Sequence, residues 1–169
     1  MSSAIKIALA NSLMLALALG MAASILFEMR HVRVSRWRLL VPGILAAASD
    51  AILIAYPEVR DLFQLELWTV NTVALGLGVA RGAFLPMFTD HNHGWVLVRR
   101  AIDGIVVAFA FTGFAAVQAG VEFRTGGDSR IEPFMEFVMT LSAGFLFGRS
   151  IASRIRASVI QHDDLDNPL

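Results

Sequence analysis

Long apolar runs alternate with short polar segments along this chain, and these runs are the main signal for its structure. A helix rises about 1.5 Å per residue, so roughly 20 apolar residues cross the hydrocarbon core of a bilayer. The runs occupy residues 5–27, 39–56, 62–80, 101–121 and 133–151. The pattern predicts an all-α membrane protein of about five transmembrane helices. We expect a single polytopic membrane domain over residues 1–169, with a polar tail at 152–169.

The first run also fits a secretory signal peptide, because Lys6 precedes its apolar core and the small residues Ala22 and Ala23 lie near its end. The apolar core of a signal peptide usually has about 7–15 residues, and this run is longer. We therefore favour a helix that is retained.

The segment between the third and fourth runs predicts a β-hairpin-like connector. Two short stretches rich in β-branched and aromatic residues, 84–89 and 95–98, flank a turn sequence from Asp90 to Gly94. Asx side chains hydrogen-bond their own backbone in turns, and glycine accepts a positive φ. Pro86 cannot donate a ladder hydrogen bond, so we expect an irregular or exposed first strand.

The residues after the fifth run predict an amphipathic C-terminal extension. Ile151, Ile155 and Val159 share one helical face, and Arg154 and Arg156 lie between them in the sequence. We expect this extension to lie on the membrane surface.

Composition supports a membrane protein and narrows its function. Of the 169 residues 56% are hydrophobic and 17% are charged, and the mean hydropathy is +0.64. About a quarter of the residues of a soluble domain are charged. The formal net charge of zero gives no reason to expect a nucleic-acid partner, and the lack of cysteine excludes disulfides, thiol catalysis and cysteine metal sites. The lipid bilayer is the partner that composition predicts.

The distribution of basic residues predicts the orientation. One side of the predicted membrane holds Arg30, Arg33, Arg36, Arg38, Arg81, Arg99, Arg100, Arg149, Arg154 and Arg156. The other side holds Lys6, Arg60, Arg124 and Arg130. Because cytoplasmic segments are enriched in Lys and Arg, we expect a periplasmic N-terminus and a cytoplasmic connector and C-terminus. The preference for arginine over lysine is typical of GC-rich bacterial genomes, so we expect a bacterial inner membrane.

Polar residues inside the runs are candidate sites. Asp50 stands near the middle of the second run, where an unpaired charge is costly. Asn71 lies at a comparable depth in the third run, and Thr112 and Thr140 lie near the middle of the fourth and fifth. We expect these side chains to be within reach of one another. They form either a proton or ligand site or a hydrogen-bonded contact that holds helices together.

The turn of the connector contains weak candidates for a metal site. Asp90, His91 and His93 are suitable ligand types, but a single His-x-His with one carboxylate supplies too few ligands. Phosphate loops, nucleophile elbows and metalloprotease motifs are absent from the sequence. We predict no catalytic residue, no cofactor and no enzymatic activity.

The connector also predicts a docking surface, because large apolar side chains there lie outside the membrane runs and need to be covered. The predicted surface comprises Arg81, Phe88, Trp95, Arg99 and Arg100. Asp103 follows these arginines at the start of the fourth run, and we expect it to pair with Arg99 and Arg100.

Small residues at four-residue spacing predict close helix packing. They include Gly20, Gly78, Gly82, Gly144 and Gly148. Five helices in one monomer do not obviously need so many, so we expect an accessory or assembly subunit of a larger membrane complex, or a homo-oligomer. The alternative function is a small proton-coupled transporter or channel that uses Asp50.

Residues 70–120 resemble the CcdC-like family of small bacterial membrane proteins. The resemblance rests on Arg81 and Gly82 at a Gly-rich helix end, on the turn with Asp90 and Gly94, and on Val96, Val98, Arg99 and Arg100. It implies four or five helices, a cytoplasmic basic loop, and an association with cytochrome c maturation genes rather than a defined activity. It carries over no catalytic residue, and the lack of cysteine argues against a direct thiol role.

Overall fold

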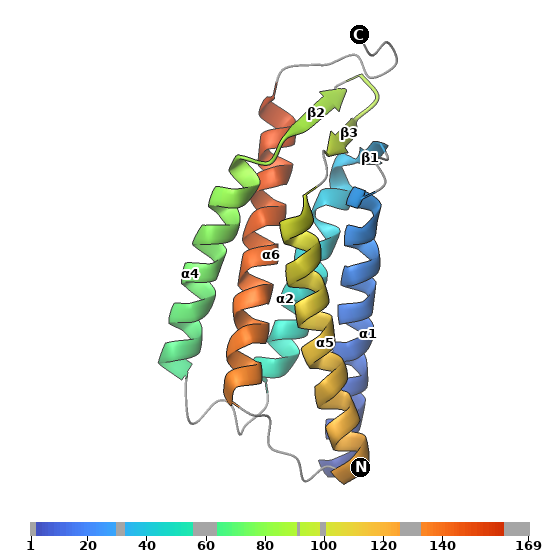
Figure 1. The fold of residues 1–169 in the computed structure, drawn as a ribbon, viewed down its shortest axis with the longest axis vertical. Helices are drawn as coiled ribbons and strands as arrows, with labels where there is room; N and C mark the ends of the chain where they lie inside the picture. Colours follow the sequence, from blue (N-terminus) through green and yellow to red (C-terminus); the bar gives the residue numbers. More distant parts are fainter. Residues whose placement is uncertain are drawn as a thin grey trace.

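A computed structural model of the chain describes residues 3–29, 33–55, 64–90, 92–98, 101–125 and 133–160. Its helices lie side by side in an elongated bundle, with a small β-sheet at one end, which we call the sheet end (Figure 1). The long helices are α1 (Ser3–Met29), α2 (Val41–Ile54), α4 (Gln64–Ala83), α5 (Ile102–Thr125) and α6 (Pro133–Val159). Helices α1, α4 and α6 run toward the sheet end, and α2 and α5 run away from it (Figure 1).

Helix α6 is central to the bundle. It packs against α4, α2 and α5, whereas α1 packs against α2 and α5. Phe111, Met139 and Leu146 are buried in the apolar interior between these helices. Val106 and Phe109 are apolar as well but lie exposed on the outside. Helices that are apolar on both their inner and outer faces are typical of proteins surrounded by lipid.

Glycines bring the backbones of α4 and α6 into direct contact. A Cβ atom added to Gly78 of α4 would overlap the Phe145 carbonyl group of α6. A Cβ atom added to Gly148 of α6 would overlap the Leu75 carbonyl group of α4, and Gly82 is equally close to α6. Close approach of backbones at small residues is how membrane helices gain van der Waals contact. Both stripes of small residues therefore pack within one chain.

The other two glycines of the predicted packing stripes lie in different surroundings. Gly144 of α6 is covered by the side chain and backbone of Asn71 from α4. Gly20 of α1 is exposed, and a Cβ atom there would reach only ordinary contact, 3.5 Å from Leu45 Cδ1. Of the five glycines in the predicted packing stripes, Gly20 of α1 is thus the one that is exposed on the surface.

The sheet has three antiparallel strands in the order β1-β3-β2. The strands are β1 (Arg33–Ser35), β2 (Met87–Asp90) and β3 (Trp95–Val98), and a 3-10 helix, η1 (Arg36–Leu39), follows β1. Strands β2 and β3 confirm the hairpin, and Gly94 adopts a φ of 67° in its turn. The sequence does not predict β1, because three residues are too few to show an alternating pattern and their partner strand is distant in the chain.

One face of the sheet packs against the end of the bundle. Val34, Met87, Val96 and Val98 are buried there together with Ala157 of α6. Because successive strand residues point to opposite faces, these positions fix which side chains remain on the outer face.

Four described stretches are long and apolar enough to cross a membrane, judged by length and composition. They are Ala8–Leu26, Arg36–Ile54, Ile102–Val121 and Phe134–Val159. The predicted third span, 62–80, corresponds to α4, which begins at Gln64 in the described residues. Helix α4 is not among the four stretches, and it carries the polar residues Glu66, Asn71 and Arg81.

The predicted amphipathic extension is a continuation of α6, which runs unbroken to Val159, and its placement on the membrane surface stays a prediction. Ala152 and Ala157 are buried, and Arg156 Nη1 donates to the Ala83 carbonyl at the end of α4. These contacts hold the last turns of α6 against the bundle end and the sheet. Residues 161–169 of the predicted polar tail lie outside the described residues.

Candidate functional site

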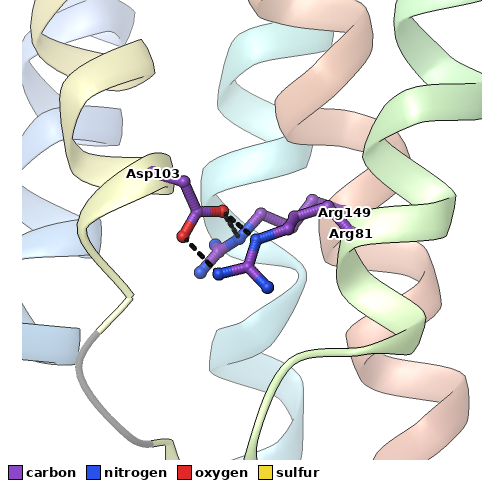
Figure 2. A network of polar contacts seen from close by, with 3 residues as sticks. All are labelled: Arg81, Asp103 and Arg149. Atoms are coloured by element: carbon purple, nitrogen blue, oxygen red, sulfur yellow. Dashed lines mark hydrogen bonds and ion pairs between the residues drawn. The ribbon is translucent and has the colours of Figure 1, made fainter.

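Two arginines and an aspartate from three helices meet at the sheet end (Figure 2). Arg81 near the end of α4 donates from Nε to Asp103 Oδ2 at 2.9 Å and from Nη2 to Asp103 Oδ1 at 3.0 Å. Arg149 of α6 approaches the same carboxylate, with its Nε 3.6 Å from Asp103 Oδ2. A two-pronged arginine–carboxylate contact is among the strongest hydrogen-bonded pairs in proteins. We call these three residues the charged cluster.

Arg149 is the buried member of the charged cluster. Its side chain is 3% exposed, compared with 39% for Arg81 and 26% for Asp103. Gly104 provides room for it, because a Cβ atom there would lie 2.8 Å from Arg149 Cζ. A guanidinium removed from water needs a nearby carboxylate to offset its lost hydration. Asp103 therefore joins α5 to both α4 and α6.

The observed partners of Asp103 come from other helices. Its predicted partners, Arg99 and Arg100, lie outside the described residues. The sequence identifies Arg149 only as a basic residue on one side of the membrane, and Arg81 as part of the predicted docking surface. Their convergence requires knowledge of helix packing, so local spacing could not reveal it.

The outer face of the sheet is apolar with a basic residue at its edge. Phe88 and Arg33 are both register partners of Leu97, one from each neighbouring strand. These side chains, with Trp95, alternate with the buried positions of the three strands, and we call Arg33, Phe88, Trp95 and Leu97 the outer sheet face. Trp95 is 41% exposed and Phe88 is 39% exposed. Contiguous large apolar side chains on a surface mark interaction sites.

The structure separates the predicted docking residues. Phe88 and Trp95 share the outer sheet face, whereas the Arg81 side chain pairs with Asp103 in the charged cluster. Arg99 and Arg100 cannot be placed in either group, since they fall between the described segments.

Asp90 organises the hairpin turn. Its Oδ1 accepts hydrogen bonds from the backbone N–H groups of Asn92 at 2.9 Å and His93 at 3.2 Å, and its Oδ2 lies 2.9 Å from His93 Nδ1. Among the described residues no three His, Asp or Glu side chains are grouped to hold a metal, and His91 falls outside that set. These contacts account for Asp90 and His93 as turn residues.

The turn is expected to weaken in acid. The His93 ring and the two backbone N–H groups hold the pKa of Asp90 below its usual value. A lowered folded-state pKa stabilises the turn above the unfolded pKa, about 3.9, and this stability is lost as the pH falls through the folded value. The fluorescence of Trp95, with Trp37 and Trp68 replaced by Phe, should therefore change below about pH 4. In Asp90→Asn that acid transition should be absent.

Asp50 and Thr140 form a buried polar pair between α2 and α6. Asp50 is 5% exposed and Thr140 is fully buried, and the two side chains face each other. Asp50 Oδ1 and Thr140 Oγ1 nevertheless have no hydrogen-bond partner among the described residues. Asp50 stands four residues before Ile54, the last residue of α2. It therefore lies nearer the end of α2 that is opposite the sheet, and its depth in the membrane stays a prediction.

The other two predicted intramembrane polar residues lie elsewhere. Asn71 packs against Gly144 on the side of α6 that faces α4. Thr112 donates to the carbonyl oxygens of Ala108 at 2.8 Å and Ala18 at 3.1 Å, which joins α5 to α1. The four predicted residues are thus divided among three helix contacts, and only Asp50 and Thr140 are brought together.

A second arginine at the sheet end contacts an aromatic ring, and this contact could not be predicted from the sequence. Arg154 Cζ of α6 lies 5.3 Å from the ring centroid of Trp37, which is 70% exposed on η1. Cations over an indole face are attracted by its quadrupole. The sequence shows Trp37 only as an aromatic residue within a basic loop.

The four apolar helical stretches are compatible with a multi-pass membrane protein, in length and composition. No family model, no curated protein and no solved structure matches the chain. The resemblance to the CcdC-like family stays a prediction.

Proposed function

We propose that this chain is a multi-pass protein of a bacterial inner membrane and acts as an accessory or assembly subunit, without catalysis of its own. The observation that carries this proposal is the outer sheet face, a set of exposed apolar side chains beyond the helices at the arginine-rich end. A membrane anchor that presents such a face has a surface suited to holding a partner.

In this proposal α4 is a fifth membrane helix. Two of its polar residues have partners in the bundle: Asn71 lies on Gly144 of α6, and Arg81 is paired with Asp103, whereas Glu66 is exposed near the start of α4. It lies alongside α6 over much of its length and runs in the same direction (Figure 1). Pairing and packing of this kind lower the cost of polar groups in a bilayer.

The proposed orientation places the sheet end in the cytoplasm and the N-terminus in the periplasm. Arginines gather at the sheet end, including Arg36, Arg38, Arg149 and Arg154, whereas Arg124 lies near the other end of α5 (Figure 1). Cytoplasmic ends of membrane helices carry this excess of basic residues.

The proposed occupant of the outer sheet face is a partner protein that presents carboxylates beside apolar side chains. Phe88, Trp95 and Leu97 supply the apolar contact, and Arg33 in the same row supplies a complementary charge. Aromatic and arginine side chains at the centre of an interface typically provide most of the binding energy.

A photo-crosslinking residue placed at Leu97 should form an adduct in cells with a protein other than this chain. The same residue at Trp68, exposed near the start of α4 away from the sheet, is the matched control and should not form that adduct. Replacing both Phe88 and Trp95 by Ala should abolish the Leu97 adduct while the helices still insert, because neither residue lies in a membrane helix. Arg33→Glu should also abolish it, because the charge complementarity is reversed.

Three outcomes would contradict this proposal. Adducts with lipid alone would identify the membrane surface as the occupant. Adducts only between copies of this chain would instead identify the protein as a homo-oligomer. A Phe88 and Trp95 double variant that loses its helices would show that these side chains belong to the core of the fold. Labelling of Trp95→Cys by an impermeant maleimide, in an otherwise cysteine-free chain, checks the orientation: inverted vesicles should react and intact cells should not.

The alternative function, a small proton-coupled transporter or channel, is favoured by the buried and unpartnered Asp50 Oδ1. Its test is flux in proteoliposomes, which Asp50→Asn should abolish. Ala46, Ala143 and Leu146 are buried among the residues between Asp50 and the sheet end. The hydroxyls of Ser49, Ser142 and Ser150 are buried there too, but among the described residues of α2 and α6 no second carboxyl group lies on that side to continue a proton path. The accessory role is therefore the preferred proposal.

A further inference from the structure

The contact between α2 and α6 has a register that can be followed from one end to the other. Near the start of α2, a Cβ atom on Gly43 would lie 2.7 Å from Ser150 Cβ and 3.0 Å from Phe147 Cα of α6. The two helices are antiparallel (Figure 1), so two turns along α2 correspond to two turns back along α6. This register places Asp50 opposite Thr140, as observed.

Glu136 continues the polar side of this contact. It stands four residues before Thr140, so the two side chains lie on one face of α6, one turn apart. It is 6% exposed and lies in the first turn of α6, at the end opposite the sheet. Toward the sheet end the buried neighbours include Ala46, Ala143 and Leu146 together with the hydroxyls of Ser49, Ser142 and Ser150. Glu136, Thr140 and Asp50 thus form a polar path that begins near the bundle end, and Asp50 is its innermost carboxyl group.

The described side chains of the neighbouring elements supply no counter-charge at this depth. Residues 8–26 of α1, whose side chains the structure describes, contain no ionisable group. On η1 and α6 the described basic side chains are Arg36, Arg38, Arg149, Arg154 and Arg156, all toward the sheet end. Ser49, next to Asp50, donates its hydroxyl to the Leu45 carbonyl at 2.9 Å. Within the part of the chain that the structure describes, a carboxylate at Asp50 therefore has no cation at its own depth on these elements.

We propose that Asp50 is a proton-binding site, loaded from the end opposite the sheet through Glu136 and Thr140. A proton from water passes to the Glu136 carboxylate, then by way of the Thr140 hydroxyl to the Asp50 carboxylate. One O–H bond breaks as each new one forms. The neutral Asp50 carboxyl then donates to Thr140 Oγ1, which satisfies both unpartnered oxygens with a single hydrogen bond. The described residues of α2 and α6 hold no other acidic side chain toward the sheet end, so the site binds a proton without conducting it across the bundle.

Infrared spectroscopy of the full chain in lipid vesicles tests this proposal. A protonated carboxyl band should be present at neutral pH, shift on transfer to heavy water, and be lost in Asp50→Asn. Thr140→Val should shift the band to higher frequency, since it removes the acceptor. The matched control is Thr112→Val, whose hydroxyl bonds backbone carbonyls between α5 and α1, and it should leave the band unchanged.

The route is tested by the rate of exchange into heavy water. Glu136→Gln should slow exchange at Asp50 by about 100-fold, because a positioned carboxyl speeds proton transfer by that order. Dicyclohexylcarbodiimide, whose C=N bond adds the O–H of a protonated membrane carboxyl, should label Asp50 in the parent and in Thr112→Val. An Asp50 that is unlabelled and shows no carboxyl band would overturn the site. Unchanged exchange in Glu136→Gln would overturn the route.

Discussion

Replacing Gly78 by alanine is expected to force α4 away from α6 and to lower the free energy of unfolding by about 3 kcal/mol, the upper end of typical overpacking costs. The added Cβ atom would overlap the Phe145 carbonyl group, and a helix backbone cannot yield as a flexible side chain can. Gly148→Ala should have a similar effect from the opposite helix, where the Leu75 carbonyl is in the way. Unfolding in mixed micelles with increasing sodium dodecyl sulfate measures both.

Gly76→Ala is the matched control, because Gly76 lies on the same helix and a Cβ atom there meets nothing within 4 Å. Alanine is the better helix former, so this variant should be as stable as the parent or slightly more stable. A Gly78→Ala variant that behaves like Gly76→Ala would show that α4 and α6 are not in backbone contact.

Asp103→Asn should lower the free energy of unfolding by about 3 kcal/mol, because it leaves a buried guanidinium without its counter-charge. Most of the effect should come from Arg149, whose side chain is 3% exposed. Arg81 is 39% exposed, and water partly solvates its charge once the pair is broken.

The double variant Asp103→Asn with Arg149→Met should recover much of the loss, since methionine fills the space beside Gly104 without a charge to satisfy. Arg124→Ala, an exposed position near the other end of α5, should change stability by less than about 0.5 kcal/mol. If Asp103→Asn is as mild as Arg124→Ala, the charged cluster does not hold the three helices together.

The sequence predicted the features that depend on local chemistry. Apolar runs gave helices at each expected place, and the turn residues Asp90 and Gly94 gave the hairpin, because each signal is contained in a short segment. The packing of the end of α6 could not be predicted in this way. Its last turns show only an amphipathic pattern in sequence, whereas Ala157 is buried against strands that come from elsewhere in the chain.

The candidate sites were harder to predict because each of them is assembled from distant segments. Depth alone placed Asp50 with Asn71, Thr112 and Thr140, but depth does not specify which faces of the helices meet. The register between α2 and α6 selects Thr140, and α6 separates Asn71 from Asp50. Arg149 was counted only as a basic residue, because the sequence does not show that Gly104 of α5 leaves room for its guanidinium beside Asp103.

The strand order also determines when the sheet can form, if the chain is inserted into the membrane while it is being synthesised. Strand β1 follows the first helix, but its only partner in the sheet is β3, which follows α4. During synthesis Val34 must wait, without its strand partner, until Val96 has left the ribosome. The inner face of the sheet is completed later still, when Ala157 of the last helix arrives. The sheet therefore closes only after the last helix, α6, has been made. A closed sheet indicates that the helices before it were inserted in the right order.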